Sequence, residues 1–180
     1  MLESKKFVYL IAFGLEKRLL LGVSKNIKEV FGFEVRTSHV ETIPNFGYEP
    51  SRGQYRADTL LEYISRLYYP DMLKLVALFP FDLYHEGFNF VFGVAPLGGS
   101  HALVSTYRLY DGDERLYFER VCKEVNHELG HTFGLPHCRR QGCVMNFSNS
   151  LWEVDRKTRF PCERCKDVIS TRFSQSNKPP

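Results

Sequence analysis

The stretch from His127 to His137 constrains this chain more than any other part of its sequence. It reads HELGHTFGLPH and places histidines at positions 127, 131 and 137. On an α-helix, residues four apart lie on one face, one turn above the other, so His127 and His131 can offer ring nitrogens to a single metal ion. Gly134 can take a positive φ and end the helix sharply, and the turn then returns His137 as a third ligand.

This ligand set is typical of a catalytic zinc ion, because three protein ligands leave the fourth position open for water. Glu128 directly follows the first ligand and is placed to take a proton from that water. We therefore predict a catalytic zinc held by His127, His131 and His137, with Glu128 as the general base. The alternative, a helix with surface histidines and no metal, is disfavoured because the glycine and the third histidine both stand at the required offsets.

The residues before the motif predict the helix that carries it. Asp111-Gly112-Asp113 is typical of a turn followed by an N-cap. Apolar residues then recur at helical spacing and predict a buried face: Phe118, Cys122, Val125, Leu129 and Phe133. We expect a different face, which carries Arg120, Glu124 and the metal ligands, to line a cleft. On that second face we expect Glu124 to be a solvated charge. On the apolar face we expect Cys122 to be a buried thiol.

Four further cysteines form a second group beside the third histidine. Cys138 directly follows His137, Cys143 comes five positions later, and Cys162 and Cys165 form a C-x-x-C pair. Two short-spaced pairs predict a tetrahedral four-thiolate zinc site, which has no open position and is structural. Two disulfides or four reduced thiols are the alternatives. We favour the metal because the apolar run at residues 7–14 predicts a buried strand rather than an export signal, and thiols inside cells stay reduced.

The combined pattern, H-E-x-x-H-x-x-G-x-x-H-C-x4-C-x-M followed by C-x-x-C, resembles that of the archaemetzincin family of metzincin metallopeptidases. The resemblance runs from His127 to Cys165. It implies one catalytic and one structural zinc, two per chain. It also implies that Met145 forms a Met-turn, an apolar floor beneath the histidines, although from the sequence alone Met145 would be an ordinary core methionine.

The order of elements predicts an α/β (α+β) fold. We expect strands at Phe7–Phe13, Phe33–Val40, Leu73–Phe79, Phe88–Ala95 and Ala102–Leu109, helices at Leu15–Phe31 and Gln54–Tyr69, and a loop at Ile43–Gly53. Crossover helices after the first two strands imply parallel pairing. The resemblance implies a metzincin-like mixed, twisted five-stranded sheet with two backing helices, an active-site helix and a small zinc-stapled C-terminal lobe. We expect His101–Tyr107 to be the edge strand that pairs with a peptide, with an internal strand as the alternative.

Length and composition predict one catalytic domain. A chain of 180 residues with 43% hydrophobic residues can bury a sizeable core. We expect an N-terminal subdomain at 1–137, a C-terminal subdomain at 138–180, and a frayed end at Ser174–Pro180. No segment approaches the roughly 20 apolar residues that span a bilayer, so we expect a soluble, cytoplasmic protein. We also expect it to be a monomer. His39, His85 and His101 have no partners at ligand spacing and are not expected to bind metal.

The charge of the chain is unevenly distributed, and this bears on its partners. Residues 138–180 carry nine basic and four acidic side chains, a balance that invites a nucleic-acid interpretation. Zinc bound by four thiolates is formally anionic, however, and basic residues near it would offset that charge: Arg139, Arg140, Arg164 and Lys166. Nucleic acid is therefore disfavoured as a partner.

The sequence thus predicts a zinc-dependent metallopeptidase in which Glu128 activates a zinc-bound water, acting on small peptides. Two alternatives remain open at this point. One is a catalytically silent, zinc-containing module that binds peptides. The other is a four-cysteine lobe that contacts nucleic acid or protein beside a vestigial site.

Overall fold

The computed structural model describes residues 5–176, with side chains to residue 171. Of the segment expected to be frayed, Ser174–Pro180, residues 177–180 lie outside the described residues, and the rest belongs to the last helix.

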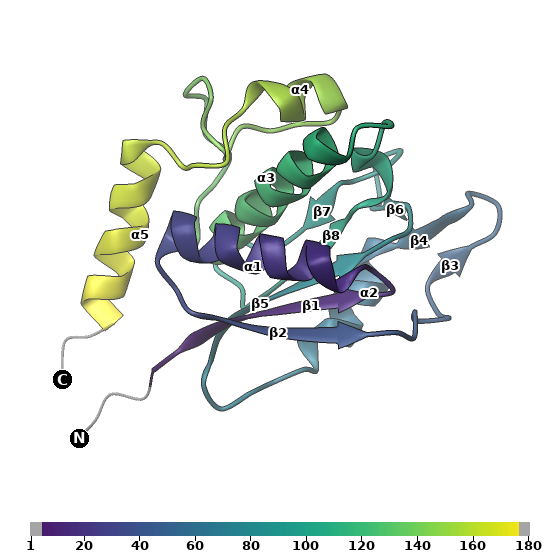
Figure 1. Cartoon of the computed structure of the whole chain (residues 1–180), viewed down its shortest axis with the longest axis horizontal. Coiled ribbons are helices and arrows are strands. Elements are labelled where there is room, and N and C mark those ends of the chain that lie inside the picture. Colours follow the sequence, from purple (N-terminus) through teal and green to yellow (C-terminus); the bar gives the residue numbers. More distant parts are fainter. Residues whose placement is uncertain (1–4, 177–180) are drawn as a thin grey trace.

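A mixed five-stranded sheet runs through the centre of the molecule (Figure 1). Its order is β2 (Val35–Val40), β1 (Phe7–Phe13), β5 (Met72–Phe79), β8 (His101–Ser105) and β7 (Gly93–Val94). The first four strands are parallel, and β7 pairs antiparallel with β8 at one edge. The predicted mixed five-stranded sheet is therefore confirmed.

Helices cover both faces of this sheet, which is why β1 and β5 are apolar runs and not alternating ones. Residues Val8, Leu10 and Ala12 of β1 face a core shared with α1 (Lys17–Phe31) and α3 (Glu114–Thr132). The intervening residues of β1 face a second core shared with α2 (Ala57–Ser65). In Figure 1, α1 and α3 lie side by side in front of the sheet.

The structure differs from the prediction in the segment between β2 and β7. A second, three-stranded sheet joins β3 (Tyr48–Glu49), β4 (Gln54–Arg56) and β6 (Leu83–Tyr84). It occupies part of the predicted loop Ile43–Gly53 and shortens the predicted helix Gln54–Tyr69 at its start. The predicted strand Phe88–Ala95 is reduced to β7. Strands of two or three residues are too short to show a periodic pattern, so they escape prediction.

The edge strand was assigned wrongly. The predicted edge His101–Tyr107 corresponds to β8, which lies between β5 and β7, and β7 is the edge. Residues 102–104 have no exposed surface because helices cover both faces of the sheet at this point. Tyr107 begins a short 3-10 helix, Tyr107–Leu109, and His101 Nε2 lies 2.8 Å from the Leu67 carbonyl oxygen.

The chain after His137 forms a lobe that packs across α3. A loop leads to α4 (Leu151–Arg156) and then to α5 (Glu163–Ser176). None of the helices within residues 5–176 combines the length and apolar character needed to cross a membrane.

Candidate metal centre

Helix α3 positions the first two histidines, and its ends are built as expected. The Asp113 side chain caps the start by accepting a hydrogen bond from Leu116 N at 2.9 Å. At the other end, Gly134 has φ 82° and its N–H donates to His131 O at 2.8 Å, while Leu135 N donates to Gly130 O at 3.0 Å. This pair of bonds is a Schellman motif, and it reverses the chain so that His137 returns towards the helix.

The three histidines form one cluster. Their candidate ligand atoms all lie within 4.8 Å of one another. The Nε2 atoms of His127 and His131 are 3.0 Å apart, close to the roughly 3.3 Å expected for two nitrogens about 2.0–2.1 Å from a tetrahedral zinc. His127 is buried, His131 is half-buried and His137 is exposed, so the cluster opens towards solvent on one side. The donor set and its geometry fit a zinc ion.

Backbone carbonyls orient the two helical histidines. His127 Nδ1 lies 2.8 Å from Val144 O, and His131 Nδ1 lies 2.7 Å from Leu135 O. When each Nδ1–H donates to its carbonyl, each Nε2 keeps its lone pair for a metal. Burial is the main cause that lowers the pKa of all three histidines, and the positive charge of Lys157 adds to it. The neutral, metal-binding form is therefore favoured.

Met145 lies against the helix at the level of the histidines. It is fully buried, and its sulfur fills the space that a side chain at Gly130 would occupy. Met145 thus contacts α3 at Gly130, the residue before His131.

Glu128 is the only acidic residue within the motif, and it is also buried. Burial, and after it the negative charge of Glu124, raise the pKa of Glu128 well above its ordinary value, while Lys157 acts in the opposite direction. A carboxyl group in this environment holds a proton more readily than one in water.

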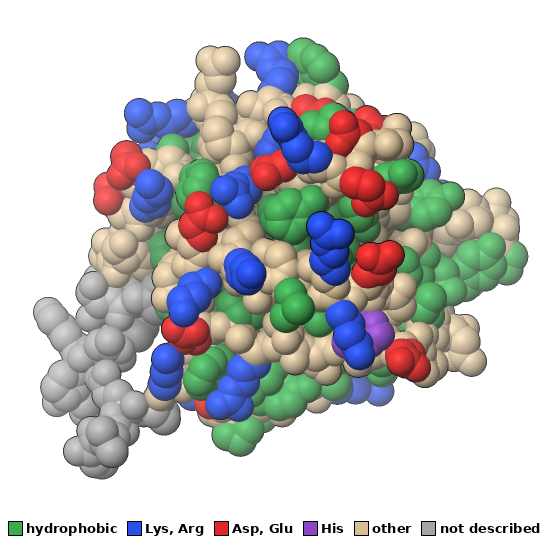
Figure 2. All heavy atoms as spheres, viewed as in Figure 1, with side chains coloured by type: hydrophobic (Ala, Val, Ile, Leu, Met, Phe, Trp, Pro, Cys, Tyr) green, Lys and Arg blue, Asp and Glu red, His purple; other side chains and the backbone are tan. Residues whose placement is uncertain are grey.

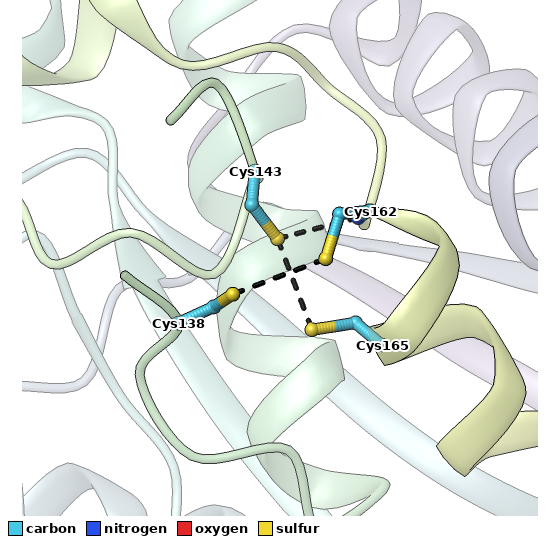
Figure 3. Close-up of side chains that lie close together, drawn as sticks. All are labelled: Cys138, Cys143, Cys162 and Cys165. Atoms are coloured by element: carbon cyan, nitrogen blue, oxygen red, sulfur yellow. Dashed lines mark hydrogen bonds between the residues drawn. The ribbon is translucent and has the colours of Figure 1, made fainter. Parts of the chain in front are cut away.

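The four predicted cysteines form a second cluster, with sulfur atoms that point towards one another (Figure 3). Two pairs, Cys138 with Cys162 and Cys143 with Cys165, each have their Sγ atoms 3.9 Å apart. A tetrahedral zinc with Zn–S bonds of about 2.3 Å would place its sulfurs about 3.8 Å apart. All four cysteines are free, so the structure contradicts the alternative of two disulfides.

Backbone N–H groups surround these thiols. Arg140 N lies 3.4 Å from Cys138 Sγ, and Cys162 N lies 3.3 Å from Cys143 Sγ. Burial opposes ionisation of Cys162, but hydrogen bonds from Cys165, Cys143 and Cys138 outweigh it and lower the pKa of Cys162 to about 7. Burial raises the pKa of Cys143 and of Cys165, so Cys162 is the thiol that these contacts favour as thiolate. Such donors stabilise thiolate, which is the form that binds zinc.

Comparison with known proteins identifies the family. The model of peptidase family M54 matches residues 20–171. An archaemetzincin from Methanopyrus kandleri is 49% identical over 133 residues, which cover 74% of this chain and 75% of the relative. This chain belongs to the archaemetzincins.

Solved structures agree with this assignment. The crystal structure of the Methanopyrus kandleri archaemetzincin covers 97% of this chain and 98% of its own, with a TM-score of 0.86 and 38% identity. A zinc-dependent peptidase from Methanocorpusculum labreanum covers 90% of this chain and 99% of its own, with a TM-score of 0.76 and 28% identity. The chain is accordingly a zinc metallopeptidase, and both its predicted family and its predicted fold class are confirmed.

In this archaemetzincin the polar face of α3 is enclosed, contrary to expectation. Glu124 was predicted to be a solvated charge, but it is 3% exposed and lies 2.8 Å from Lys157 Nζ. Arg120 is buried as well, between Asp111 and Asp155. The reason is that the lobe after His137 packs on this face and supplies Lys157 and Asp155, while Asp111 comes from the turn before α3.

Lys157 is the residue near the site that sequence reasoning missed. Its Nζ lies 3.3 Å from Asn146 O and 3.5 Å from His127 Nδ1, in addition to the ion pair with Glu124. No motif or spacing distinguishes it from other lysines. Cys122, by contrast, is a buried free thiol as predicted. Among the described residues, His39, His85 and His101 belong to no group of three or more candidate metal ligands.

Proposed function

We propose that this archaemetzincin hydrolyses peptide bonds at the three-histidine cluster, with Glu128 as the general base. The observation that carries the proposal is the convergence of one ring nitrogen from each of the three histidines, next along the helix to the buried Glu128. His127, His131 and His137 would hold a catalytic zinc. Cys138, Cys143, Cys162 and Cys165 would hold a structural zinc, giving two per chain.

The chain's own part in the reaction is the handling of one proton. Zinc, when bound, lowers the pKa of water to about 7 and polarises the scissile carbonyl. Glu128 accepts the proton of the attacking water and then donates it to the leaving amine. Its raised pKa suits this double role, because the group must accept a proton and hold it until the carbon–nitrogen bond breaks.

Strand β7 takes over the substrate-pairing role first assigned to His101–Tyr107. Phe92 O accepts a hydrogen bond from Ser105 N at 2.7 Å, so alternation along the strand turns the backbone groups of Gly93 away from β8. An extended peptide could pair with these groups. Because Gly93 also lies against Glu128, a peptide paired there would pass the proposed base. We infer small peptides as substrates.

Comparison of Glu128→Ala with Glu119→Ala tests the proposal. Glu119 lies on the same helix but is partly exposed and pairs with Arg159. We expect two zinc ions per chain in the parent and in both variants. Loss of the base should reduce cleavage of a peptide library about 10²–10⁴-fold, whereas Glu119→Ala should cleave like the parent.

Two outcomes would reject parts of this proposal. Parent-like cleavage by Glu128→Ala would exclude Glu128 as the base. A parent that holds both zinc ions and binds peptides without cleaving them would be the silent peptide-binding module. The division at residues 137 and 138, the monomeric state and the cytoplasmic location stay predictions.

The face drawn in Figure 2 gives no support to nucleic acid as a partner. Basic and acidic side chains are interspersed there instead of gathering by sign. Nucleic-acid binding surfaces instead concentrate positive charge in a patch or stripe.

A further inference from the structure

Gly93, on the edge strand β7, approaches Glu128 more closely than any residue with a side chain could. A β-carbon added to Gly93 would lie 2.6 Å from Glu128 Cγ and 2.8 Å from Glu128 Oε1. It would also lie 2.8 Å from the carbonyl oxygen of Leu103. These separations are well inside the roughly 3.5–4.0 Å of favourable contact between heavy atoms. Any side chain at position 93 would therefore move the glutamate or the strand.

Backbone conformation does not explain this glycine. Gly93 is not one of the positive-φ glycines, and it pairs with Val104 as an ordinary strand residue. Glycine weakens a strand and often marks a place where another group comes close to the backbone. Here that group is the Glu128 side chain.

The Glu128 carboxyl group has little else to fix its position. Within the part of the chain that the structure describes, no hydrogen bond to it is formed, although the residue is buried. Helix α3 fixes its α-carbon, but the long side chain can still rotate. The backbone of Gly93 lies against the Glu128 side chain and restricts this rotation.

We propose that Gly93 is a positioning residue for Glu128. Its bare α-carbon lets β7 lie against the glutamate, so that the carboxyl group and the strand edge keep a fixed relation. The inference rests on the proposed function, since it assumes that Glu128 is the base. A peptide paired with β7 would then meet the carboxyl group at a constant distance, which aids a reaction that depends on orientation.

Steady-state kinetics of Gly93→Ala test this role. We expect kcat to fall at least about tenfold and KM to change less than about threefold, because a misplaced base slows the chemical step without preventing binding. The zinc content should match that of the parent. Gly99→Ala is the matched control, since Gly99 also lacks a positive φ and its added β-carbon would meet Pro96 instead of a site residue. A parent-like kcat in Gly93→Ala would overturn the proposal.

Thermal unfolding gives a second test that does not depend on activity. We compare the effect of Gly93→Ala in two backgrounds, the parent and Glu128→Ala. The fall in Tm should be at least about twice as large in the parent, because Glu128→Ala lacks the side-chain atoms that the new methyl group would meet. An equal fall in Tm in both proteins would mean that the new methyl group clashes with the Leu103 carbonyl oxygen and not with Glu128, and this would overturn the proposal. If Gly93→Ala does not fold by itself, the variant that combines Gly93→Ala with Glu128→Ala decides the question. A folded double variant supports the contact between Gly93 and Glu128, and an unfolded one contradicts it. Should Glu128→Ala prove active, the proposed function fails, while this coupling still reports on the contact.

Discussion

His127 Nδ1 lies 2.8 Å from the carbonyl oxygen of Val144, and Val144 stands between Cys143 and Met145. A residue of the cysteine cluster is therefore one position away from the group that orients the first histidine. On the other side of the cluster, Cys138 directly follows His137. The two candidate zinc sites are joined at both points, so a change in one should be measurable in the other.

Replacing Cys143 should weaken zinc binding at the histidines. In Cys143→Ser the loop that carries Val144 loses a metal anchor, and disturbance of such outer partners costs about 10–100-fold in metal affinity. Competition with a chromophoric chelator measures this, with Cys122→Ala as the control because Cys122 belongs to neither cluster. Loss of one zinc with unchanged affinity for the other would show that the sites are independent.

Thiol counting should separate the four clustered cysteines from the fifth. In the zinc-loaded protein we expect no reaction with a disulfide reagent, and after chelation four thiols should react. Cys122 should stay protected, because it has no exposed surface and lies in the core beneath α3. Burial, and after it the charge of Glu119, also raise the pKa of this thiol to about 12. Its reactive thiolate is therefore scarce at neutral pH. Five reactive thiols before unfolding would contradict this.

Gly130→Ala should destabilise the protein although alanine favours helices. The added methyl group meets the buried Met145 sulfur, and overpacking of a core costs about 1–3 kcal/mol, more than the up to about 1 kcal/mol gained in helix propensity. Denaturant unfolding measures the difference. Gly22→Ala is the comparison, because Gly22 also lies within a helix and its methyl group would meet the half-buried ring of Phe118 instead of the fully buried Met145. A more stable Gly130→Ala would show that Met145 can move aside.

Lys157→Met should be among the most destabilising substitutions near the site. It leaves Glu124 buried without its partner, and breaking a buried ion pair costs about 3–5 kcal/mol. Adding Glu124→Leu should restore most of the loss in denaturant unfolding. Arg66→Met removes an exposed pair with Glu62 and should cost at most about 1 kcal/mol. Similar losses in the two single variants would mean that water reaches Lys157.

The sequence allowed prediction of helix α3 and both clusters because their determinants are local. Asp113, Gly134 and the histidine spacing act within one helix and its two ends. Lys157 escaped prediction because it meets His127 and Glu124 from a segment far along the chain, and such a contact leaves no periodic pattern. The burial of Glu124 was missed for the same reason, since only the packed lobe shows what covers that helix face.

Strand β7 is two residues long, and its length has a consequence for self-association. Open sheet edges tend to pair with other chains, and very short edge strands limit that tendency because they offer few hydrogen bonds. A second copy of the chain would gain little by docking here. A peptide substrate would also be held by its scissile carbonyl at the metal site, so it needs fewer hydrogen bonds to the strand. An edge strand that is too short to pair with another chain can therefore still bind a peptide.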